Sequence, residues 1–408
     1  MKVCFFSPTA YGYFNPDSNT WAGGAETQQV LIARHMLQRG IDVSFIVGDY
    51  GQADVELIEG ITLIKSFQPF TGNRKLRFIP DMRAILRAMK IADADLYNQR
   101  STSFFTGQLA YFARRLGKRF TFSVGSDYNC YPDCQKRLPF PLTHLYRYGL
   151  RAAGAIIAQT ETQQRLIRRH FNLESVLIRN GIVIPPAGGD NETERPSAHV
   201  PAGGPAGGDP GVHVESPAAR EDTAREFLWV GSFRRLKRPE LFIELARRVP
   251  GARFTMVGGR GDDPAYFEHI ARDARALPNL TYAGFIPPGE MDGFYRRAYA
   301  FVNTSNLEGF PNTYLHSWVW GVPTLTMEID PDGIIERHRI GASGGGFEGL
   351  VGAVGSLCGN PTLRAEMSRR AYRYVREHHD ITDRGDDYIR LFEKLLSTSA
   401  MSASRRSE

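Results

Sequence analysis

The chain of 408 residues is long enough for two or three domains that each bury a core, which excludes a small fold held together by disulfides. Its composition, 42% hydrophobic and 23% charged, is typical of a soluble globular protein and not of a disordered or membrane-embedded chain. No apolar run approaches the roughly 18 to 20 residues of a membrane-spanning helix, and the first residues turn polar too early for a signal peptide. We therefore expect a cytoplasmic protein.

The cysteines also indicate a protein without disulfide bonds. Four cysteines, Cys4, Cys130, Cys134 and Cys358, are too few and too scattered for a disulfide framework. Cys130 and Cys134 have no second close pair that would complete a zinc site. We expect reduced thiols.

Positive charge is concentrated in the first half of the chain. Residues 1–185 hold 23 Lys and Arg against 14 Asp and Glu, whereas the rest holds 27 against 30. Nucleic acid is one partner that a basic half suits, but no recognisable binding motif is present, so we predict no nucleic acid. Peripheral contact with an anionic membrane, at its inner face, or a phosphorylated acceptor fits better. The alternative is a solvated face without a partner.

The first 185 residues alternate short β-rich runs with helical stretches, as parallel sheets with crossover helices require. A helix is predicted over 25–39, where Val30, Ala33 and Leu37 form one stripe and Gly40 ends the pattern. Strands are predicted over 3–7, 41–47, 61–64, 95–98, 120–124, 155–159 and 175–178. Together these elements predict one doubly wound domain over 1–185.

A change in composition then separates this domain from a second. Residues 186–222 are rich in Pro, Gly and Ala, and we predict a flexible linker there. The alternation restarts over 223–384, which predicts a second doubly wound domain. A closing helix over about 385–398 is expected to rejoin the first domain, and 399–408 is expected to be a disordered tail. Two such domains leave a cleft between the carboxyl ends of two sheets, where α/β proteins bind ligands.

The most informative segment follows the predicted strand 300–303. A loop carries Glu308, and Pro311 begins a helix whose first N–H groups include those of Asn312 and Thr313. Such a helix end presents about half a positive charge and suits a diphosphate. Glu308 is placed to accept hydrogen bonds from two neighbouring sugar hydroxyls. The alternative is that Glu308 only caps the helix.

This segment resembles the donor-site signature of the retaining family-four glycosyltransferases of the GT-B fold, E-G-F-x-N-x-x-L leading into G-x-P. The matching positions are Glu308, Gly309, Phe310, Asn312, Leu315, Gly321 and Pro323. The resemblance implies two Rossmann-like domains that face a central cleft and an enzyme of bacterial surface-polysaccharide type. It further implies that Glu308 contacts the transferred sugar, with Gly309, Phe310, Pro311, Asn312 and Thr313 around the donor.

The second acidic position of the signature, eight residues after Glu308, holds His316 instead. In the family this position binds the nucleotide ribose. A neutral imidazole can pair with one ribose hydroxyl where a carboxylate pairs with two, so the departure suggests a weaker or altered nucleotide preference. The alternative is an inert helix residue.

A second segment, from Gly231 to Lys237, resembles the family's G-R-x-x-x-x-K, whose arginine and lysine neutralise the leaving diphosphate. Lys237 matches the lysine, whereas Ser232 stands at the arginine position. Arg234 or Arg235 is expected to supply the missing charge, because negative charge builds on the leaving group in the transition state. The alternative is a solvated basic loop.

Further resemblances lie in the first domain. Gly23 and Gly24 stand in the loop that faces the donor phosphates in the family, although a Gly pair by itself is shared by many tight turns. Arg100 and Asp127 follow predicted strands where related enzymes place polar residues beside the acceptor. Asn180 and Gly181 resemble the family's N-G-I/V segment.

Two aspartate pairs, Asp330 with Asp332 and Asp93 with Asp95, fit a D-x-D metal motif. In the layout that the resemblance implies, cationic side chains and a helix end already stabilise the diphosphate. We therefore expect no metal and no other cofactor, with the nucleoside-diphosphate sugar as co-substrate.

The sequence thus favours a glycosyltransferase that moves a sugar, with retention of configuration, onto a hydroxyl of a saccharide or lipid-linked acceptor. Ser232 and His316, where the family has charged groups, leave open a nucleotide-sugar-binding partner subunit of weak activity. Another GT-B enzyme, such as a sugar-nucleotide epimerase, is the third reading.

Overall fold

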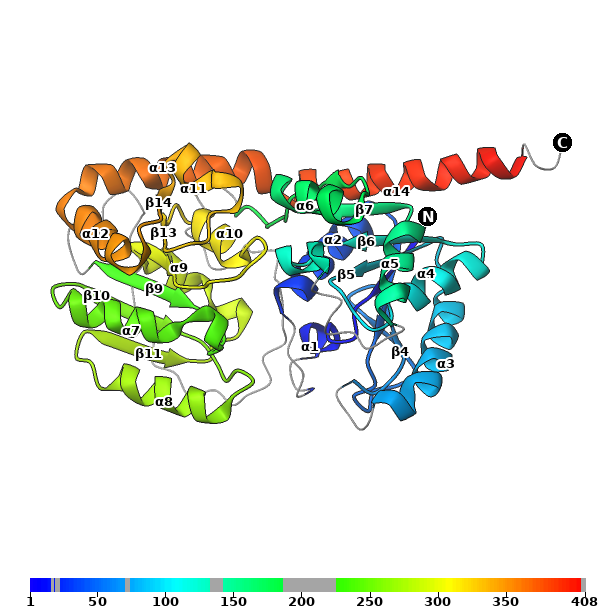
Figure 1. Cartoon of the computed structure of the whole chain (residues 1–408), viewed down its shortest axis with the longest axis horizontal. Coiled ribbons are helices and arrows are strands. Elements are labelled where there is room, and N and C mark those ends of the chain that lie inside the picture. The colour runs from blue at the N-terminus through cyan, green and yellow to red at the C-terminus, as the bar shows by residue number, and fades with distance from the viewer. Residues whose placement is uncertain (16–17, 19–22, 70–73, 133–141, 186–224, 405–408) are drawn as a thin grey trace. The chain divides into compact units, whose positions relative to one another are not determined.

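The computed structural model describes residues 1–15, 18, 23–69, 74–132, 142–185 and 225–404 (Figure 1). The chain forms two compact units. Unit 1 comprises Met1–Val183 together with His379–Glu408, and unit 2 comprises Ile184–His378. The predicted linker over 186–222 lies outside the described residues.

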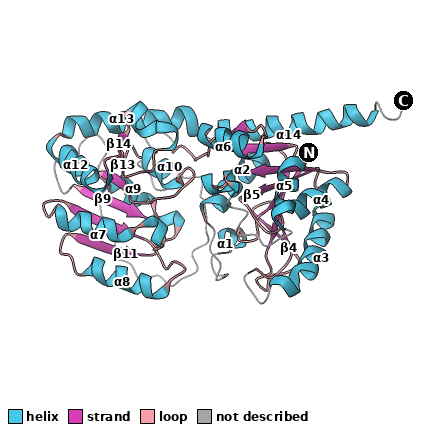
Figure 2. Cartoon of the chain, in the orientation of Figure 1, coloured by secondary structure: helices cyan, strands magenta, loops and turns pink. Residues whose placement is uncertain are grey.

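Unit 1 is built on a sheet in the order β3-β4-β2-β1-β5-β6-β7-β8. Figure 2 shows the strands of both units in magenta. Its strands are β1 (Lys2–Phe6), β2 (Asp42–Val47), β3 (Val55–Ile58), β4 (Ile61–Lys65), β5 (Leu96–Arg100), β6 (Arg119–Ser123), β7 (Ala155–Ala158) and β8 (Val176–Leu177). All neighbouring strands pair in parallel except β3, which pairs antiparallel with β4 at the edge. The parallel strands are mostly buried, except β8 at the edge, as expected of a sheet that helices cover on both faces.

Two apolar cores lie on the two faces of this sheet, because side chains alternate along each strand. One core contains residues of α3 (Arg74–Ala92), α4 (Thr106–Arg115), α5 (Leu142–Ala152) and α6 (Glu161–Phe171). The other contains residues of α1 (Tyr11–Phe14), α2 (Gly24–Gln38) and α14 (Ile381–Ser404). In β1, Cys4 and Phe6 face the first core, and Val3 and Phe5 face the second.

Helix α14 packs against α2 through polar and close backbone contacts. His35 Nε2 lies 2.7 Å from Asp386 Oδ1, and Arg39 donates to Asp386 Oδ2 at 2.8 Å. A Cβ atom added at Gly385 would lie 2.2 Å from Cδ2 of His35, so glycine is required where the two helices meet. The helix also continues to Ser404 and includes residues 399–404, which the sequence analysis assigned to a disordered tail; residues 405–408 are not described.

Unit 2 has the strand order β11-β10-β9-β12-β13-β14, with all pairs parallel. Its strands are β9 (Glu226–Val230), β10 (Arg253–Val257), β11 (Leu280–Gly284), β12 (Ala300–Asn303), β13 (Thr324–Thr326) and β14 (Gly341–Ser343). Its helices are α7 (Pro239–Arg248), α8 (Pro264–Arg275), α9 (Asp292–Arg297), α10 (Asn312–Trp318), α11 (Ile334–His338), α12 (Gly346–Gly359) and α13 (Pro361–His379). The order reverses between β9 and β12, and such a switch point is where open α/β sheets bind ligands.

The two doubly wound α/β folds confirm the predicted fold class. The sequence did not predict β3, β14 or helices α3 to α6, and it described unit 1 as parallel throughout. Within the described residues, no helix is both long enough and apolar enough to cross a membrane. Cys4, Cys130 and Cys358 are free thiols.

Candidate active site

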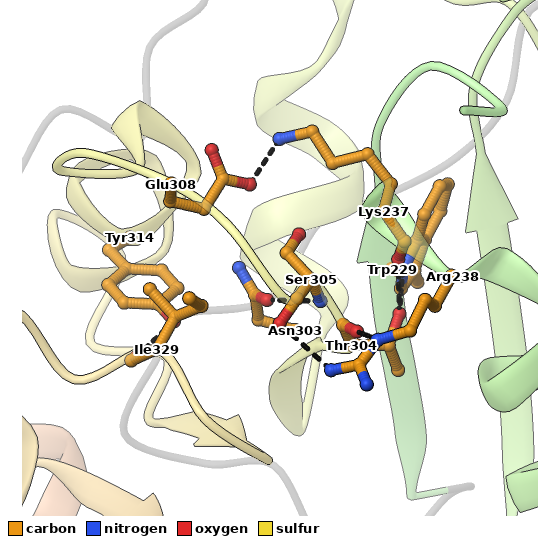
Figure 3. Close-up of polar contacts among 9 residues, drawn as sticks. All are labelled: Trp229, Lys237, Arg238, Asn303, Thr304, Ser305, Glu308, Tyr314 and Ile329. Carbon is orange, nitrogen blue, oxygen red and sulfur yellow. Dashed lines mark hydrogen bonds and ion pairs between the residues drawn. The ribbon is translucent and has the colours of Figure 1, made fainter. Parts of the chain in front are cut away.

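The loops that follow β9 and β12 meet at the switch point of unit 2. Strands β9 and β12 are parallel neighbours, with Phe227 opposite Ala300, so their carboxyl ends lie together. The Lys237 ammonium group, from the β9 loop, donates a hydrogen bond to the Glu308 carboxylate, from the β12 loop (Figure 3). The structure therefore brings together the two residues that the sequence placed in separate motifs.

Hydrogen bonds hold these two loops in register beneath the ion pair. The Thr304 hydroxyl donates to the Lys237 carbonyl at 2.7 Å and accepts from the Trp229 indole N–H at 3.0 Å. The Asn306 amide donates to the Leu236 carbonyl at 3.0 Å. Because Trp229 and Thr304 are buried, the backbone that carries Lys237 is anchored in the core of unit 2.

Arg238, next to Lys237, forms further hydrogen bonds between the two loops. Its guanidinium group donates to the carbonyls of Thr304 at 2.6 Å and Ser305 at 3.1 Å, and to the Glu328 carboxylate at 2.9 Å. The Arg238 backbone is left-handed, with φ 47°, a conformation that costs a non-glycine residue about 1 to 3 kcal/mol. The three hydrogen bonds offset that cost and keep the Lys237 loop against β12.

The Lys237–Glu308 pair is partly buried but remains accessible to solvent. The Glu308 and Lys237 side chains retain 14% and 26% of their accessible surface. A cation and a carboxylate at this depth are accessible to a small ligand and are screened less than surface charges. Chemically, the ammonium group suits a phosphate and the carboxylate suits hydroxyl donors.

The arginines of the same loop lie apart from this pair. Arg234 forms an ion pair with Asp262 at 3.3 Å, and Arg235 forms one with Asp263 at 3.1 Å. Both acids belong to the loop after β10, which packs backbone to backbone against the β9 loop: a Cβ atom added at Gly258 would lie 1.9 Å from the Gly231 carbonyl oxygen. Gly231 thus lies at a tight junction of two loops, and Arg234 is engaged there rather than at Glu308.

Residues 309–311 connect Glu308 to α10, whose first turn begins at Asn312. Gly309 and Phe310 are buried, and the Phe310 ring packs edge-on against Trp318, with 6.1 Å between centroids. Pro311 is the N-cap residue, so the helix begins at Asn312, one residue later than predicted. Asn312 and Thr313 form the first turn and are half-buried.

His316 lies on α10 with its ring stacked on Tyr295 of α9, at 5.6 Å between centroids and an interplanar angle of 18°. Burial lowers the pKa of the His316 imidazole, although nearby Asp292 acts in the opposite direction. The ring is therefore neutral at pH 7, as the sequence analysis assumed.

The remaining predicted site residues belong to unit 1. Gly23 is the N-cap of α2, and its amide donates to the Glu26 carboxylate at 2.8 Å; Gly24 is the first residue of the helix. Arg100 is buried and donates to the Asn180 side chain at 2.7 Å, and burial lowers its pKa. Asp127 is half-buried and accepts a hydrogen bond from Gln163 at 2.9 Å.

Aspartates of the two D-x-D sequences, Asp330 and Asp93, are bound by other groups of the protein. Asp330 accepts hydrogen bonds from the amides of Ile335 and Glu336, at 2.8 and 3.2 Å, at the start of α11. Asp93 forms an ion pair with Lys118 at 2.8 Å. In the described ranges, His, Cys, Asp and Glu side chains form no group of three that is suited to a metal ion.

Sequence reasoning missed the supporting residues of the site: Trp229, Arg238, Thr304 and Glu328. Three of them adjoin recognised motifs, since Arg238 follows Lys237, Thr304 follows β12 and Trp229 lies in β9. Their hydrogen bonds join segments 66 to 90 residues apart in the sequence, which no local pattern predicts.

Comparisons with known proteins identify the family and the fold. The model of Glycosyltransferase Family 4 matches residues 22–184, and that of Glycosyl transferases group 1 matches residues 215–373. Sucrose-phosphate synthase from Thermosynechococcus elongatus superposes with a TM-score of 0.74 at 14% identity, covering 98% of this chain and 100% of that chain. Anabaena HepE in complex with UDP-glucose gives a TM-score of 0.68 at 14% identity, covering 97% and 100%.

Among curated relatives, D-inositol 3-phosphate glycosyltransferase of Acidothermus cellulolyticus is 31% identical over 176 residues, 39% of each chain. The chain matches half or less of the length of the curated relatives. The two family models together cover most of the sequence. The chain belongs to the glycosyltransferases of the GT-B fold, with a family 4 domain followed by a group 1 domain.

Proposed function

We propose that the protein transfers a sugar from a nucleoside-diphosphate sugar to a hydroxyl of a saccharide or lipid-linked acceptor, in the synthesis of a cell-surface polysaccharide. The observation that carries the proposal is the approach of Lys237 and Glu308 at the switch point of unit 2. A phosphate ligand and a sugar hydroxyl each find a suitable partner there, within the span of one sugar phosphate.

The relatives support a nucleotide sugar as donor. Anabaena HepE has been solved in complexes with UDP-glucose and with UDP and glucose. The relative from Acholeplasma laidlawii is named alpha-monoglucosyldiacylglycerol synthase, a name that describes a glycosylated lipid. These names describe those proteins, and they motivate donor and acceptor classes for this chain.

The proposed reaction breaks the bond between the anomeric carbon and the diphosphate oxygen and forms one between that carbon and the acceptor oxygen. Lys237 stabilises the negative charge that develops on the diphosphate, and Glu308 orients the sugar. The acceptor proton passes to the departing phosphate oxygen, so no side-chain base is required. Attack from the face that the diphosphate leaves gives retention of configuration.

In the absence of donor, Lys237 and Glu308 neutralise each other. A diphosphate carries more negative charge than one carboxylate, so donor binding displaces Glu308 from Lys237. The released carboxylate is then available to the sugar hydroxyls. Under this proposal the ion pair keeps both groups desolvated and oriented until the donor arrives, which lowers the reorganisation that the transition state requires.

The other predicted residues keep proposed roles. Arg234 adds positive charge near the diphosphate once it leaves Asp262, and His316 pairs with one ribose hydroxyl. Gly231 and the first turn of α10, at Asn312 and Thr313, complete the donor site.

The unit 1 residues have proposed roles as well. We assign Gly23 and Gly24 to the donor phosphates, and Asp127 and Arg100 to the acceptor.

We further propose that no divalent metal is needed, because Lys237 supplies a cation and the Asp330 carboxylate is already engaged by two amides of α11. Turnover that survives a chelator supports this, and turnover that a chelator abolishes and Mg²⁺ restores contradicts it.

A donor and acceptor screen tests the function. The protein is incubated with UDP-, GDP- and ADP-sugars and with saccharide or polyprenyl-phosphate acceptors, and released nucleotide is quantified. Acceptor-dependent release supports the transferase. Donor binding without release under every combination indicates instead a nucleotide-sugar-binding subunit, which Ser232 and the Arg234–Asp262 pair would then explain.

A further inference from the structure

Three of the four helices that cover one face of the unit 1 sheet, α3, α4 and α5, are strongly basic; the fourth, α6, contains the acid Glu161. Helices α3, α4 and α5 contain ten Lys and Arg and one acid, Asp81, which is buried. On the opposite face, α2 and α14 carry five acids and four Lys and Arg. The outward sides of α3, α4 and α5 are here called the basic face, and their described exposed cations are Arg83, Arg87, Lys90, Arg114, Arg115, Arg147 and Arg151.

On helix α3, exposed cations are flanked by exposed apolar side chains. Ile79, Arg83, Arg87, Lys90 and Ile91 are exposed and follow one another at spacings that place them on one side of a helix. Ile79 and Ile91 keep 61% and 45% of their surface accessible. The inward residues Ile85, Ala88 and Met89 are buried in the core, so this orientation is fixed by packing.

The edge strand β3 extends the apolar part of this face. Val55 lies opposite Ile64 in the antiparallel pair, and Ile64 belongs to the same core as α3, so Val55 and Leu57 point toward the α3 side of the sheet. Leu57 is 72% exposed. Asp54 forms an ion pair with Arg87 at 3.5 Å, which ties the start of this strand to the helix.

The neighbouring helices extend the charge. Tyr111, Arg114 and Arg115 of α4 and Arg151 of α5 are exposed, and both helices pack on the same core as α3. Neither helix contains an acidic residue. Apolar side chains thus lie along α3 and β3, and cations extend from α3 across two further helices.

We infer that the basic face docks the protein onto an anionic lipid bilayer. Interspersed cations and isolated exposed Ile, Leu and Tyr side chains match an interface where phosphates lie beside acyl chains. A nucleic acid would account for the cations but not for Leu57, Ile79 and Ile91. The inference goes beyond the proposed function and is measured without donor or acceptor, so it stands or falls separately from sugar transfer.

Vesicle binding tests the inference. Wild-type protein is sedimented with phosphatidylcholine vesicles that contain or lack phosphatidylglycerol, at low and high salt. We expect binding that requires the anionic lipid and weakens steeply as salt screens it. The variant R83E/K90E/R114E should bind at least about a hundredfold more weakly, because each cation near the surface contributes about fivefold.

A control variant of equal charge change separates the face from net charge. Arg369, Arg373 and Lys394 are exposed and lie on α13 and α14, and R369E/R373E/K394E should bind vesicles nearly as wild type does. Both variants should keep wild-type circular dichroism and wild-type donor hydrolysis in solution. A further variant, L57Q/I79Q, should lose the part of the binding that persists at high salt.

Three results would overturn the inference: equal binding to neutral vesicles, equal loss in the two charge variants, or displacement of the vesicles by a DNA duplex of matched charge concentration. The last result would assign the face to nucleic acid.

Discussion

Lys237 and Glu308 form a direct ion pair although 71 residues separate them in the sequence. The pair exists because β9 and β12 are adjacent at the switch point of unit 2, and because Thr304 and Arg238 bind the two loops to each other. If sugar transfer depends on this geometry, loss of either side chain should slow it.

Removing either partner should slow sugar transfer by two to three orders of magnitude. We expect this of Lys237→Ala and of Glu308→Gln, by analogy with the roughly 2.7 to 4 kcal/mol lost when one transition-state contact is deleted. The double variant should be slower than either but well short of the product of the two effects, since both residues act on one donor. Steady-state nucleotide release measures all three.

An exposed ion pair of the same unit provides the matched control. Arg248 of α7 and Glu348 of α12 pair at 2.9 Å on the surface. Because such pairs contribute little, Arg248→Ala and Glu348→Gln should turn over as wild type does. Equal losses in the two pairs would mean that the effect is one of general stability rather than of the site.

Gly385 should not tolerate a side chain. Its missing Cβ allows α14 to approach His35 of α2, and the 2.2 Å clash in Gly385→Ala forces the helices apart. We expect a destabilisation of about 1 to 3 kcal/mol, as in other overpacked contacts. Hydrogen exchange of the α2 and α14 amides should report it, because only the pair of helices in contact needs to open.

A control for Gly385→Ala is a substitution at a helical glycine that has open space around it. Nothing lies within 4 Å of a Cβ added at Gly355 of α12, so Gly355→Ala should stabilise unit 2 by about 0.5 to 1 kcal/mol. Destabilisation by both substitutions, or by neither, would contradict the account of the α2–α14 contact.

Asp386 predicts how the stability of unit 1 depends on pH. The hydrogen bond from His35 first, and the charge of Arg39 next, lower the pKa of the Asp386 carboxyl below its usual 3.8. A lowered folded-state pKa stabilises the fold above the unfolded value and ceases to do so as pH falls through the folded value. Asp386→Asn should therefore be less stable than wild type at pH 6, and the difference should shrink below about pH 4. Urea unfolding followed by circular dichroism measures it; a difference that is constant with pH contradicts it.

His316 predicts a flat pH response of nucleotide binding. Burial lowers the imidazole pKa from 6.5, so the ring is neutral at pH 7 and above, and the affinity for a nucleotide sugar, whose esterified diphosphate does not titrate near neutral pH, should show no inflection between pH 7 and 8. His316→Gln keeps a neutral hydrogen-bonding group and should bind within about threefold of wild type, whereas His316→Leu should lose three- to tenfold, the worth of one hydrogen bond. Titration calorimetry with a nucleotide sugar measures the affinity, and an inflection above pH 6.5 would contradict the prediction.

Much of this architecture could be predicted from the sequence. The alternation of β-rich and helical runs predicts both doubly wound sheets, and Glu308 and Lys237 stand out because their segments resemble two motifs of the family. Arg238 does not, because a left-handed arginine has no local signature; only its partners Thr304, Ser305 and Glu328 explain it. The contact of Gly385 with His35 has no local signature either, since it depends on two helices from opposite ends of the chain.

Charge patterns gave a partial answer. The excess of Lys and Arg over 1–185 indicated a basic half of the chain. It did not indicate which surface carries the charge, because the sequence does not show which residues of α3 are buried. The Arg234 assignment shows the opposite difficulty: sequence proximity to Lys237 suggested a shared ligand, whereas the structure pairs Arg234 with Asp262.

The most direct test of the central claim compares the affinities of a nucleotide sugar and of its free nucleoside diphosphate for two variants. If Lys237 binds the diphosphate and Glu308 the sugar, Lys237→Ala weakens both ligands, whereas Glu308→Gln weakens only the nucleotide sugar. The Glu308→Gln variant should bind the free diphosphate as well as wild type or better, because Lys237 loses its competing carboxylate. Equal weakening of both ligands by Glu308→Gln, or no effect of Lys237→Ala on either, would contradict the account.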